Sequence, residues 1–145
     1  MIALDTNLLV YAHKEASEFN LLITEALRPV IEGVAPWALP WPCVHEFIGV
    51  VTNPRIYKPA SSMPDALSFL DSLMTAPNLQ LLAESPGYFD KLRDIVLACK
   101  ISGPRIHDAR IAALCLHHGV SELWTADRDF SIFPQLRTRN PLVKS

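Results

Sequence analysis

The chain has 145 residues, of which 50% are hydrophobic and 19% charged, and its formal net charge is -2 at pH 7. This is the size of one ordinary domain with a real hydrophobic core, and the composition excludes a disordered or fibrous protein. The apolar runs are too short for a membrane span, and the first residues, MIALDTN, lack the basic start of a signal peptide. The cysteines Cys43, Cys99 and Cys115 form no CxxC motif, so we expect reduced thiols in a cytoplasmic protein.

Short apolar strands alternate with amphipathic helices along the chain. We predict strands at 2–4, 37–42, 78–84 and 120–125, with a weak fifth strand near 138–143. Helices are predicted at 17–33, 42–53, from Pro64 to 74, at 86–101 and at 105–118. The alternation indicates an α/β fold, in which helices flank a mostly parallel central sheet of strand order 3-2-1-4-5. No linker divides the chain, so we expect one domain at 1–142 and a C-terminal tail at 143–145.

Four acidic residues fall close to one edge of this predicted sheet. Asp5 directly follows the first strand, and Asp127 follows the fourth. Glu46 lies one turn into the helix after the second strand, and Asp108 lies in the first turn of the helix before the fourth strand. Function in such sheets gathers at the carboxyl ends of the strands, where the strand order reverses. We therefore expect the four carboxylates to converge at this edge.

Carboxylates that converge in a partly dry site need a cation. Like charges a few ångströms apart repel strongly unless a cation holds them. Carboxylates without a cysteine or histidine cluster suit Mg²⁺, with Mn²⁺ able to substitute, and such ions also bind substrate phosphate. The neighbouring Thr6, Asn7 and Thr125 can orient a carboxylate or hold a metal-bound water. The chemistry expected from such a site is attack of a metal-activated water on a phosphodiester.

Each acid taken alone has a simpler explanation. Asp5 can cap a following helix, Asp108 suits the N-terminus of any helix, and Glu46 can be a surface residue. The prediction of a metal site therefore rests on all the acids together. An aspartyl-nucleophile phosphatase is another possible function. It would need an acid two residues after Asp5, where Asn7 stands.

Four stretches of the sequence resemble the acidic motifs of PIN domains, in the same order: MIALDTNLLVYA, CVHEF, IHDARIAALCLHHGV and LWTADRDF. The resemblance extends from Ile2 to about Leu142. A further stretch, EFIGVVTNPRIY, is similar to the VapC-type toxin ribonucleases of bacterial toxin–antitoxin pairs. The first motif alone is weak, whereas DTN, HDARIAAL and TADRDF together are fairly specific for this family.

The resemblance implies a PIN-like fold and a function. It makes Asp5, Glu46, Asp108 and Asp127 the catalytic, metal-binding acids of a Mg²⁺-dependent endoribonuclease. It also implies a toxin that acts on RNA, forms a homodimer and is inhibited by a VapB-type antitoxin protein. The alternative is a PIN-like module that binds RNA or a partner without cleavage, and the intact set of four acids counts against it.

The two acids of the TADRDF motif receive different predicted roles. Asp127 comes first after the strand, closest to the end of the first strand, so we assign it to the metal. Asp129 falls where a short turn begins. We expect it to accept backbone N–H groups of residues 131–132 or to pair with Arg128, while Phe130 fills the core beneath.

Basic and apolar side chains indicate contacts with substrate and with a second subunit. Arg105, Arg110 and Arg128 neighbour the acids and are candidates for phosphate binding, because guanidinium groups can bind phosphate through two hydrogen bonds. The helices also carry more apolar positions than a chain of this length can bury, and exposed apolar patches mark interfaces. We therefore predict a dimer interface at Leu21, Leu22, Leu70, Leu73 and Met74.

Overall fold

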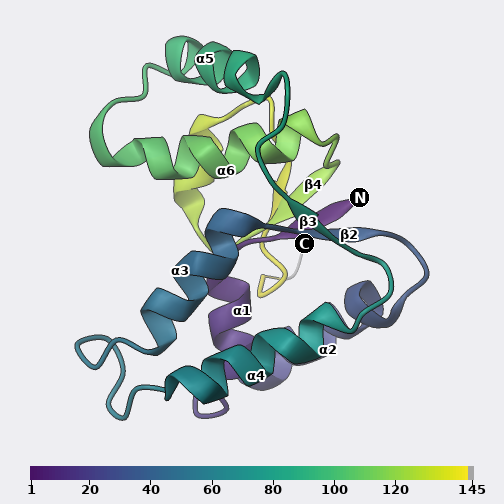
Figure 1. Ribbon diagram of the computed structural model, residues 1–145, viewed down its shortest axis with the longest axis vertical. Helices are drawn as coiled ribbons and strands as arrows, with labels where there is room; N and C mark the ends of the chain where they lie inside the picture. Colours follow the sequence, from purple (N-terminus) through teal and green to yellow (C-terminus); the bar gives the residue numbers. More distant parts are fainter. Residues whose placement is uncertain (144–145) are drawn as a thin grey trace.

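Five parallel strands form the central sheet, in the order β3-β2-β1-β4-β5 (Figure 1). In this computed structural model, which describes residues 1–143, the strands are β1 (Ile2–Leu4), β2 (Trp37–Pro40), β3 (Leu79–Leu82), β4 (Glu122–Trp124) and β5 (Thr138–Arg139). The predicted strand order is confirmed. Residues 144–145 of the predicted C-terminal tail lie outside the described residues.

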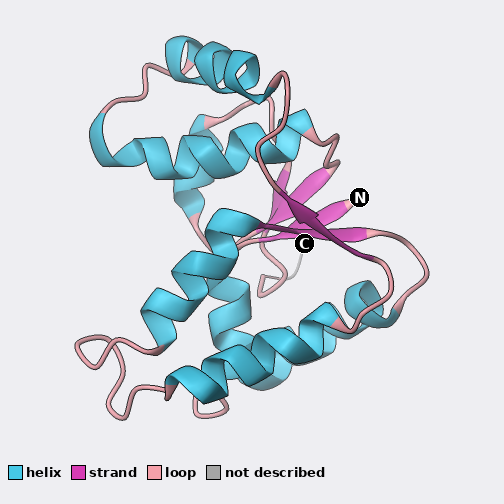
Figure 2. Cartoon of the chain, viewed as in Figure 1, coloured by secondary structure: helices cyan, strands magenta, loops and turns pink. Residues whose placement is uncertain are grey.

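Helices cover both faces of the sheet (Figure 2). The helices α1–α4 lie on one face, and α5 and α6 lie on the other (Figure 1). Their bounds are α1 (Thr6–His13), α2 (Asn20–Glu32), α3 (Trp41–Val51), α4 (Met63–Met74), α5 (Tyr88–Ala98) and α6 (Ile106–His117). Two short 3₁₀ helices, η1 (Gly103–Arg105) and η2 (Arg128–Ile132), precede α6 and follow β4.

Helix α1 is not predicted by the sequence pattern. Its buried apolar residues Leu8, Leu9 and Val10 are consecutive, so they lack the spacing of a helix that buries only one face. The side chain of Asp5 caps this helix by accepting the backbone N–H of Thr6 at 2.8 Å. The helix is short and surrounded by neighbouring elements, and tertiary packing rather than periodicity stabilises it.

Helix α2 begins at Asn20, three residues later than predicted. The Asn20 side-chain amide donates to the carbonyls of Tyr11 and Ala12, at 2.9 and 3.1 Å, and so ties the start of α2 to the end of α1. The hydroxyl of Ser17 only accepts the N–H of Phe19 within the connecting turn. Pro29 lies inside α2 without dividing it.

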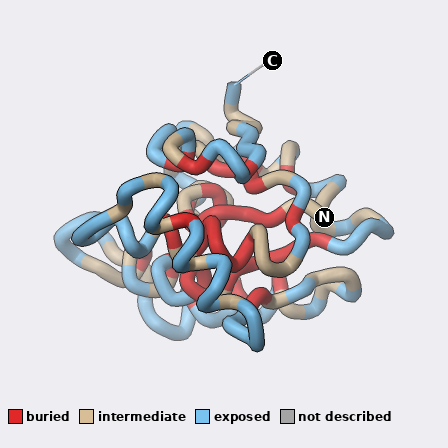
Figure 3. Tube along the Cα trace, turned by 90° about the horizontal axis from the view of Figure 1, so that it is seen from above, coloured by how far each residue is buried: buried red, intermediate tan, exposed pale blue. Residues whose placement is uncertain are grey.

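Successive strand residues are buried on opposite faces of the sheet, which separates two cores. Toward α6 the central strands β1 and β2 present the small Ala3 and Ala38, so that helix can pack closely on them, while β3 and β4 present Leu82 and Leu123. Toward α1–α4 the strands present larger side chains: Leu4, Trp37, Leu39 and Trp124. Both cores lie in the buried interior of Figure 3. None of the helices in the described residues is long and apolar enough to cross a membrane.

The pairing of β1 with β4 determines where the first acid emerges. Leu4 lies opposite Trp124, and the backbone N–H of Asp5 donates to the carbonyl of Trp124 at 3.0 Å. Asp5 and Thr125 therefore leave the sheet at the same level. The site described below lies at these two neighbouring strand ends.

Candidate active site

A cavity of about 230 Å³ opens at the carboxyl ends of β1 and β4, and all four predicted acids line it. Asp5 follows β1, Glu46 lies on α3, Asp108 lies in the first turn of α6, and Asp127 follows β4. Helix α3 starts where β2 ends, so it begins at the carboxyl edge of the sheet. Helix α6 leads into the amino end of the parallel strand β4, so α6 begins at the carboxyl edge as well. The topology thus brings together acids that are up to 122 positions apart in the chain, from 5 to 127.

Asp5 is the most buried of these acids, with 4% of its surface exposed. Its Oδ2 accepts a hydrogen bond of 2.7 Å from the hydroxyl of Thr125, and its Oδ1 accepts the N–H of Thr6. The thiol of Cys43 lies 3.6 Å from Oδ1. Burial raises the pKa of Asp5, and the hydrogen bonds lower it only in part. Burial thus disfavours the ionised carboxylate, and a cation in the cavity would stabilise it.

The hydroxyl of Thr125 joins both strand ends. It donates to Asp5, and it accepts the backbone N–H of Asp127 at 3.0 Å and the amide of Asn7 at 3.4 Å. Asn7 in turn accepts the backbone N–H of Ala126 through Oδ1, at 3.2 Å. Thr125 and Asn7 therefore position the carboxylate of Asp5 and the backbone that carries Asp127.

Glu46 and Asp108 experience the charge of the other acids. Burial and then the charge of Asp5 raise the pKa of Glu46. Burial also raises the pKa of Asp108, followed by the charges of Asp127 and Asp5, whereas Arg105 lowers it. These shifts show that the carboxylates interact across one cavity, since like charges make each ionised form less favourable.

The predicted capping role of Asp129 is wrong. Asp127, not Asp129, caps η2: its side chain accepts the backbone N–H of Asp129 at 2.8 Å. The strand ends at Trp124, and the 3₁₀ turn begins earlier than the sequence suggested, so the preceding acid holds the capping position. Asp129 is exposed and does not line the cavity, although its charge contributes to the raised pKa of Asp108. Phe130 fills the core, as predicted.

The three predicted phosphate-binding arginines occupy different positions. Arg110 forms an ion pair with Glu84, with 3.3 Å between Nε and Oε1, and it does not line the acidic cavity. Arg105 is exposed beside Asp108. Arg128 is exposed and lines a separate polar cavity that also reaches Asp127. Of the three, Arg105 and Arg128 are therefore placed near the acids.

The sequence pattern missed two aromatic residues of the cavity wall. Tyr11 and Tyr57 line the cavity, from α1 and from the loop between α3 and α4. Tyr11 lies four residues after Asn7 on α1, so the two side chains share one face of the helix. A helix predicted at this position would therefore have indicated Tyr11 as a neighbour of the site. Nothing in the sequence around Tyr57 indicates the site, because its loop approaches α1 only in the folded chain.

The residues of the cavity fit a hard divalent cation. They offer carboxylate oxygens, and none of the described residues on the cavity wall is a histidine or a cysteine. The buried hydroxyl of Thr6 lies beside Glu46 and Cys43 and lowers the pKa of both groups, so it adds a polar oxygen next to the acids. Within residues 1–143 no three carboxylate, imidazole or thiol groups lie close enough to enclose an ion. The carboxylates would have to move closer together to enclose an ion.

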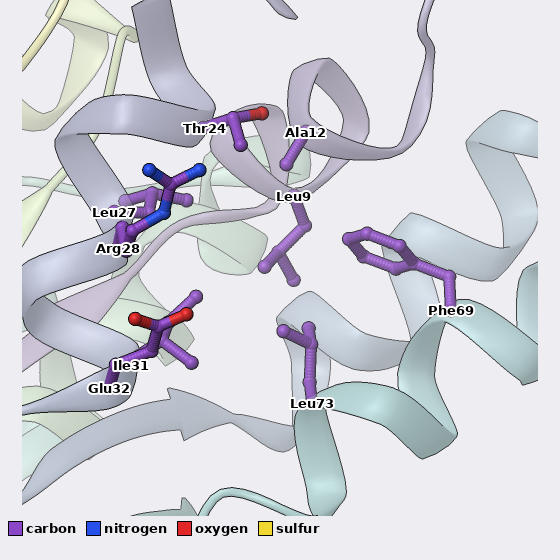
Figure 4. Close-up of a pocket in the computed structure, with 9 residues that line it drawn as sticks. All are labelled: Leu9, Ala12, Thr24, Leu27, Arg28, Ile31, Glu32, Phe69 and Leu73. Atoms are coloured by element: carbon purple, nitrogen blue, oxygen red, sulfur yellow. The ribbon is translucent and has the colours of Figure 1, made fainter. Parts of the chain in front are cut away.

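A second cavity, of about 250 Å³, has a different character (Figure 4). It lies between α1, α2 and α4, with Arg28 and Glu32 on one side and Phe69 and Leu73 on the opposite side. Leu9 lies between these two sides. The lining that the structure describes is mostly apolar and offers a single carboxylate, so this groove lacks the chemistry of the acidic cavity.

Comparison with known proteins shows the family of this chain. The PIN domain family model matches residues 2–136. The chain is 32% identical over 142 residues to the VapC ribonuclease Mb2897 of Mycobacterium bovis, covering 98% of this chain and 96% of the relative. The chain is a PIN domain of the VapC family. It is also 28% identical to Ribonuclease VapC48 of Mycobacterium tuberculosis, over 94% of both chains.

Solved structures show the same fold for this PIN domain. The crystal structure of VapBC2 from Rickettsia felis, bound to a DNA fragment from their promoter, superimposes with a TM-score of 0.70. The match covers 97% of this chain and 98% of the other, at 19% sequence identity. The sheet order and the flanking helices of the PIN domain are thus retained where most of the sequence has changed.

Proposed function

We propose that this PIN domain is a metal-dependent endoribonuclease, the toxin of a toxin–antitoxin pair, which hydrolyses RNA phosphodiester bonds. The observation that carries the proposal is the single cavity lined by Asp5, Glu46, Asp108 and Asp127. A protein that only binds RNA has no need to hold several carboxylates together against their repulsion. The relatives that match nearly the whole chain are named as ribonucleases, which supports RNA as the substrate.

The four carboxylates would hold Mg²⁺ or Mn²⁺. A bound divalent ion supplies positive charge at the scissile phosphate and a Lewis acid for the attacking water. Thr125 keeps Asp5 oriented through its 2.7 Å hydrogen bond, and the wall around Asp5 excludes bulk water. Arg105, exposed beside Asp108, adds a positive charge that can attract a phosphate to the rim of the cavity.

The metal dependence is tested directly with purified protein and structured RNA. Cleavage is expected to stop in EDTA and to return when Mg²⁺ or Mn²⁺ exceeds the chelator. Isothermal titration of Mn²⁺ gives an independent measure of binding, and Asp108→Asn is expected to weaken it. Cleavage that persists in chelator would exclude the metal mechanism. Binding of RNA without cleavage in any metal would instead favour the alternative, a non-cleaving PIN module.

We also propose an antitoxin protein of the VapB type as partner. The VapBC2 structure of Rickettsia felis and the FitAcB structure of Neisseria gonorrhoeae share this fold, and their names pair the matched chain with a second component. In this chain the groove of Figure 4 offers an apolar floor at Leu9, between the charged Arg28 and Glu32 on one side and Leu73 on the other. An amphipathic helix would match such a groove.

The proposed nuclease domain spans residues 1–142, and we propose a cytoplasmic location. Cys43, Cys99 and Cys115 are free thiols, and two of them, Cys43 and Cys115, are buried in the core. Unpaired cysteines in a folded core are typical of a reducing compartment. Such a location would also give the enzyme access to RNA.

A further inference from the structure

A larger cavity adjoins the acidic one. It has a volume of about 590 Å³ and lies between the end of α1, the turn that follows it and the loop between α3 and α4. Tyr11 and Tyr57 line both cavities, so the two tyrosines form the boundary between them. A molecule that extends out of the acidic cavity on this side must pass these two rings.

The boundary is aromatic. The ring of Tyr11 packs against Phe19, with 5.1 Å between the ring centroids. Burial raises the pKa of Tyr57, and the nearby hydroxyl of Tyr11 raises it further, so the phenol of Tyr57 stays neutral at physiological pH. Neutral aromatic rings at the mouth of a phosphate-binding cavity are suited to stack with nucleobases.

A lysine is held beside this boundary. The ammonium of Lys14 lies 4.5 Å from the ring centroid of Tyr57 and donates to the hydroxyl of Ser61 at 2.8 Å. Nε2 of His13 lies 2.8 Å from the same hydroxyl, which further orients Ser61. Within residues 1–143, Lys14 forms no ion pair. Its positive charge is therefore fixed in place and available to a phosphate.

We propose that this larger cavity binds single-stranded RNA next to the scissile phosphodiester, with Tyr57 stacking on a base and Lys14 binding a phosphate. The inference rests on the proposed ribonuclease function and extends it to the substrate. A volume of about 590 Å³ lies within the roughly 300–1,000 Å³ of small-ligand sites, so it admits a nucleotide. The bases of a duplex are already paired and stacked, so they are not free to stack on Tyr57. Lys58 also lines the cavity and adds a second positive charge, whereas Glu15 and Glu18 repel phosphate, so the phosphate contact is expected near the two lysines.

The test measures binding separately from cleavage. The probe is a fluorescent single-stranded RNA of about twelve nucleotides, with anisotropy recorded in chelator at several salt concentrations. We compare the parent with Lys14→Gln, Tyr57→Ala and Tyr57→Phe, and with Lys91→Gln on the exposed surface of α5 as the matched control. Thermal melting of each variant shows whether the fold is retained.

Lys14→Gln is expected to weaken binding and to reduce the salt slope by about 0.7, the value for one phosphate contact on a single strand. Tyr57→Ala is expected to weaken binding about tenfold, whereas Tyr57→Phe should bind like the parent because the ring is retained. Lys91→Gln should behave like the parent. A duplex of the same sequence should bind more weakly than the single strand.

Several results would overturn the inference. One is a salt slope in Lys14→Gln equal to that in Lys91→Gln, and another is full binding by a folded Tyr57→Ala variant. Tighter binding of duplex than of single-stranded RNA would overturn it as well, and so would a parent that does not bind RNA. If the parent cleaves RNA in Mn²⁺ while the variants bind normally, only this inference fails. If binding depends on Lys14 and Tyr57 but no cleavage occurs, the inference stands and the nuclease proposal fails.

Discussion

The backbone N–H of Asp129 donates a hydrogen bond of 2.8 Å to the side chain of Asp127. The acid that caps η2 is thus the same acid that lines the cavity. Its backbone N–H is in turn held by Thr125 at 3.0 Å, so the position of its carboxylate is determined from two directions. The side chain of Asp129 neither caps η2 nor lines the cavity, and the two acids of this motif therefore have different roles.

Substitutions at these two acids should separate capping from metal binding. Asp127→Asn is expected to lose Mn²⁺ affinity and cleavage with little change in melting temperature, because asparagine also caps helices. Asp127→Ala should lose both and also about 1 kcal/mol of stability. Asp129→Ala should leave stability nearly unchanged, since its side chain does not cap η2. Loss of Mn²⁺ binding in Asp129→Asn but not in Asp127→Asn would reverse the proposed roles.

Removal of the Asp108 charge should stabilise the metal-free protein in a pH-dependent way. Burial and neighbouring acids raise the pKa of Asp108 in the folded state. The protonated form is then favoured by folding, so the stability that it provides is present at low pH and is lost as pH rises through the folded pKa. Asp108→Asn should therefore have a larger free energy of unfolding than the parent at pH 7, measured by urea denaturation in EDTA.

The difference between Asp108→Asn and the parent should shrink as pH falls toward about 4, near the pKa of an unfolded aspartate. Cleavage by this variant should nevertheless be lower by orders of magnitude at every pH. A stability difference that is constant from pH 4 to 7 would show that repulsion at Asp108 is not its cause, because the asparagine side chain of the variant does not titrate.

Thr125 should matter for activity more than for stability. Thr125→Val keeps the shape of the side chain but removes the hydroxyl that donates to Asp5 and accepts from Asp127. We expect a fall in cleavage rate with a melting temperature only a few degrees lower, because a net hydrogen bond contributes about 1 kcal/mol. Thr125→Ser restores the hydroxyl and should recover most of the activity. An equally inactive Thr125→Ser variant would contradict the orienting role.

The predicted dimer interface needs correction, because two of its residues belong to the core. Leu70 and Leu73 are 4% and 8% exposed and point from α4 into the core. Leu21 and Leu22 on α2 are 70% and 46% exposed. Helical periodicity on α4 directs its apolar face inward, as the sheet and α3 require. Leu21 and Leu22 are the residues of the predicted interface that remain largely exposed and able to contact a second subunit.

A dimer built on α2 should dissociate when this surface becomes charged. Leu21→Lys should raise the dissociation constant without lowering the melting temperature of the monomer, because Leu21 is exposed. Light scattering at micromolar concentrations measures the effect, and Leu97→Lys, an exposed leucine on α5, serves as the control. A parent that is monomeric across this range would remove the prediction, and a dimer broken only by Leu97→Lys would place the interface on α5.

The sheet order and the set of acids could be predicted from local sequence patterns. Short apolar runs followed by acids mark strand ends, and their alternation with helices leaves few arrangements of a parallel sheet. Asp5 and Asp127 could be placed at one edge on this basis alone. Glu46 and Asp108 followed because each lies on a helix that begins at that edge. These are local signals, since each depends only on a few neighbouring residues.

Helix α1, the cap at Asp127 and the aromatic wall could be seen only in the folded chain. Helix α1 depends on neighbours that surround it on most sides, so its residues carry no periodic pattern. The cap depends on where β4 ends, which is determined by pairing with β1 and not by residues 124–130 themselves. Tyr57 reaches the site because Ser61 is hydrogen-bonded to Lys14 and His13 across 47 and 48 positions of sequence. Contacts between distant segments leave no trace in a local pattern, because their energy appears only when the chain is folded.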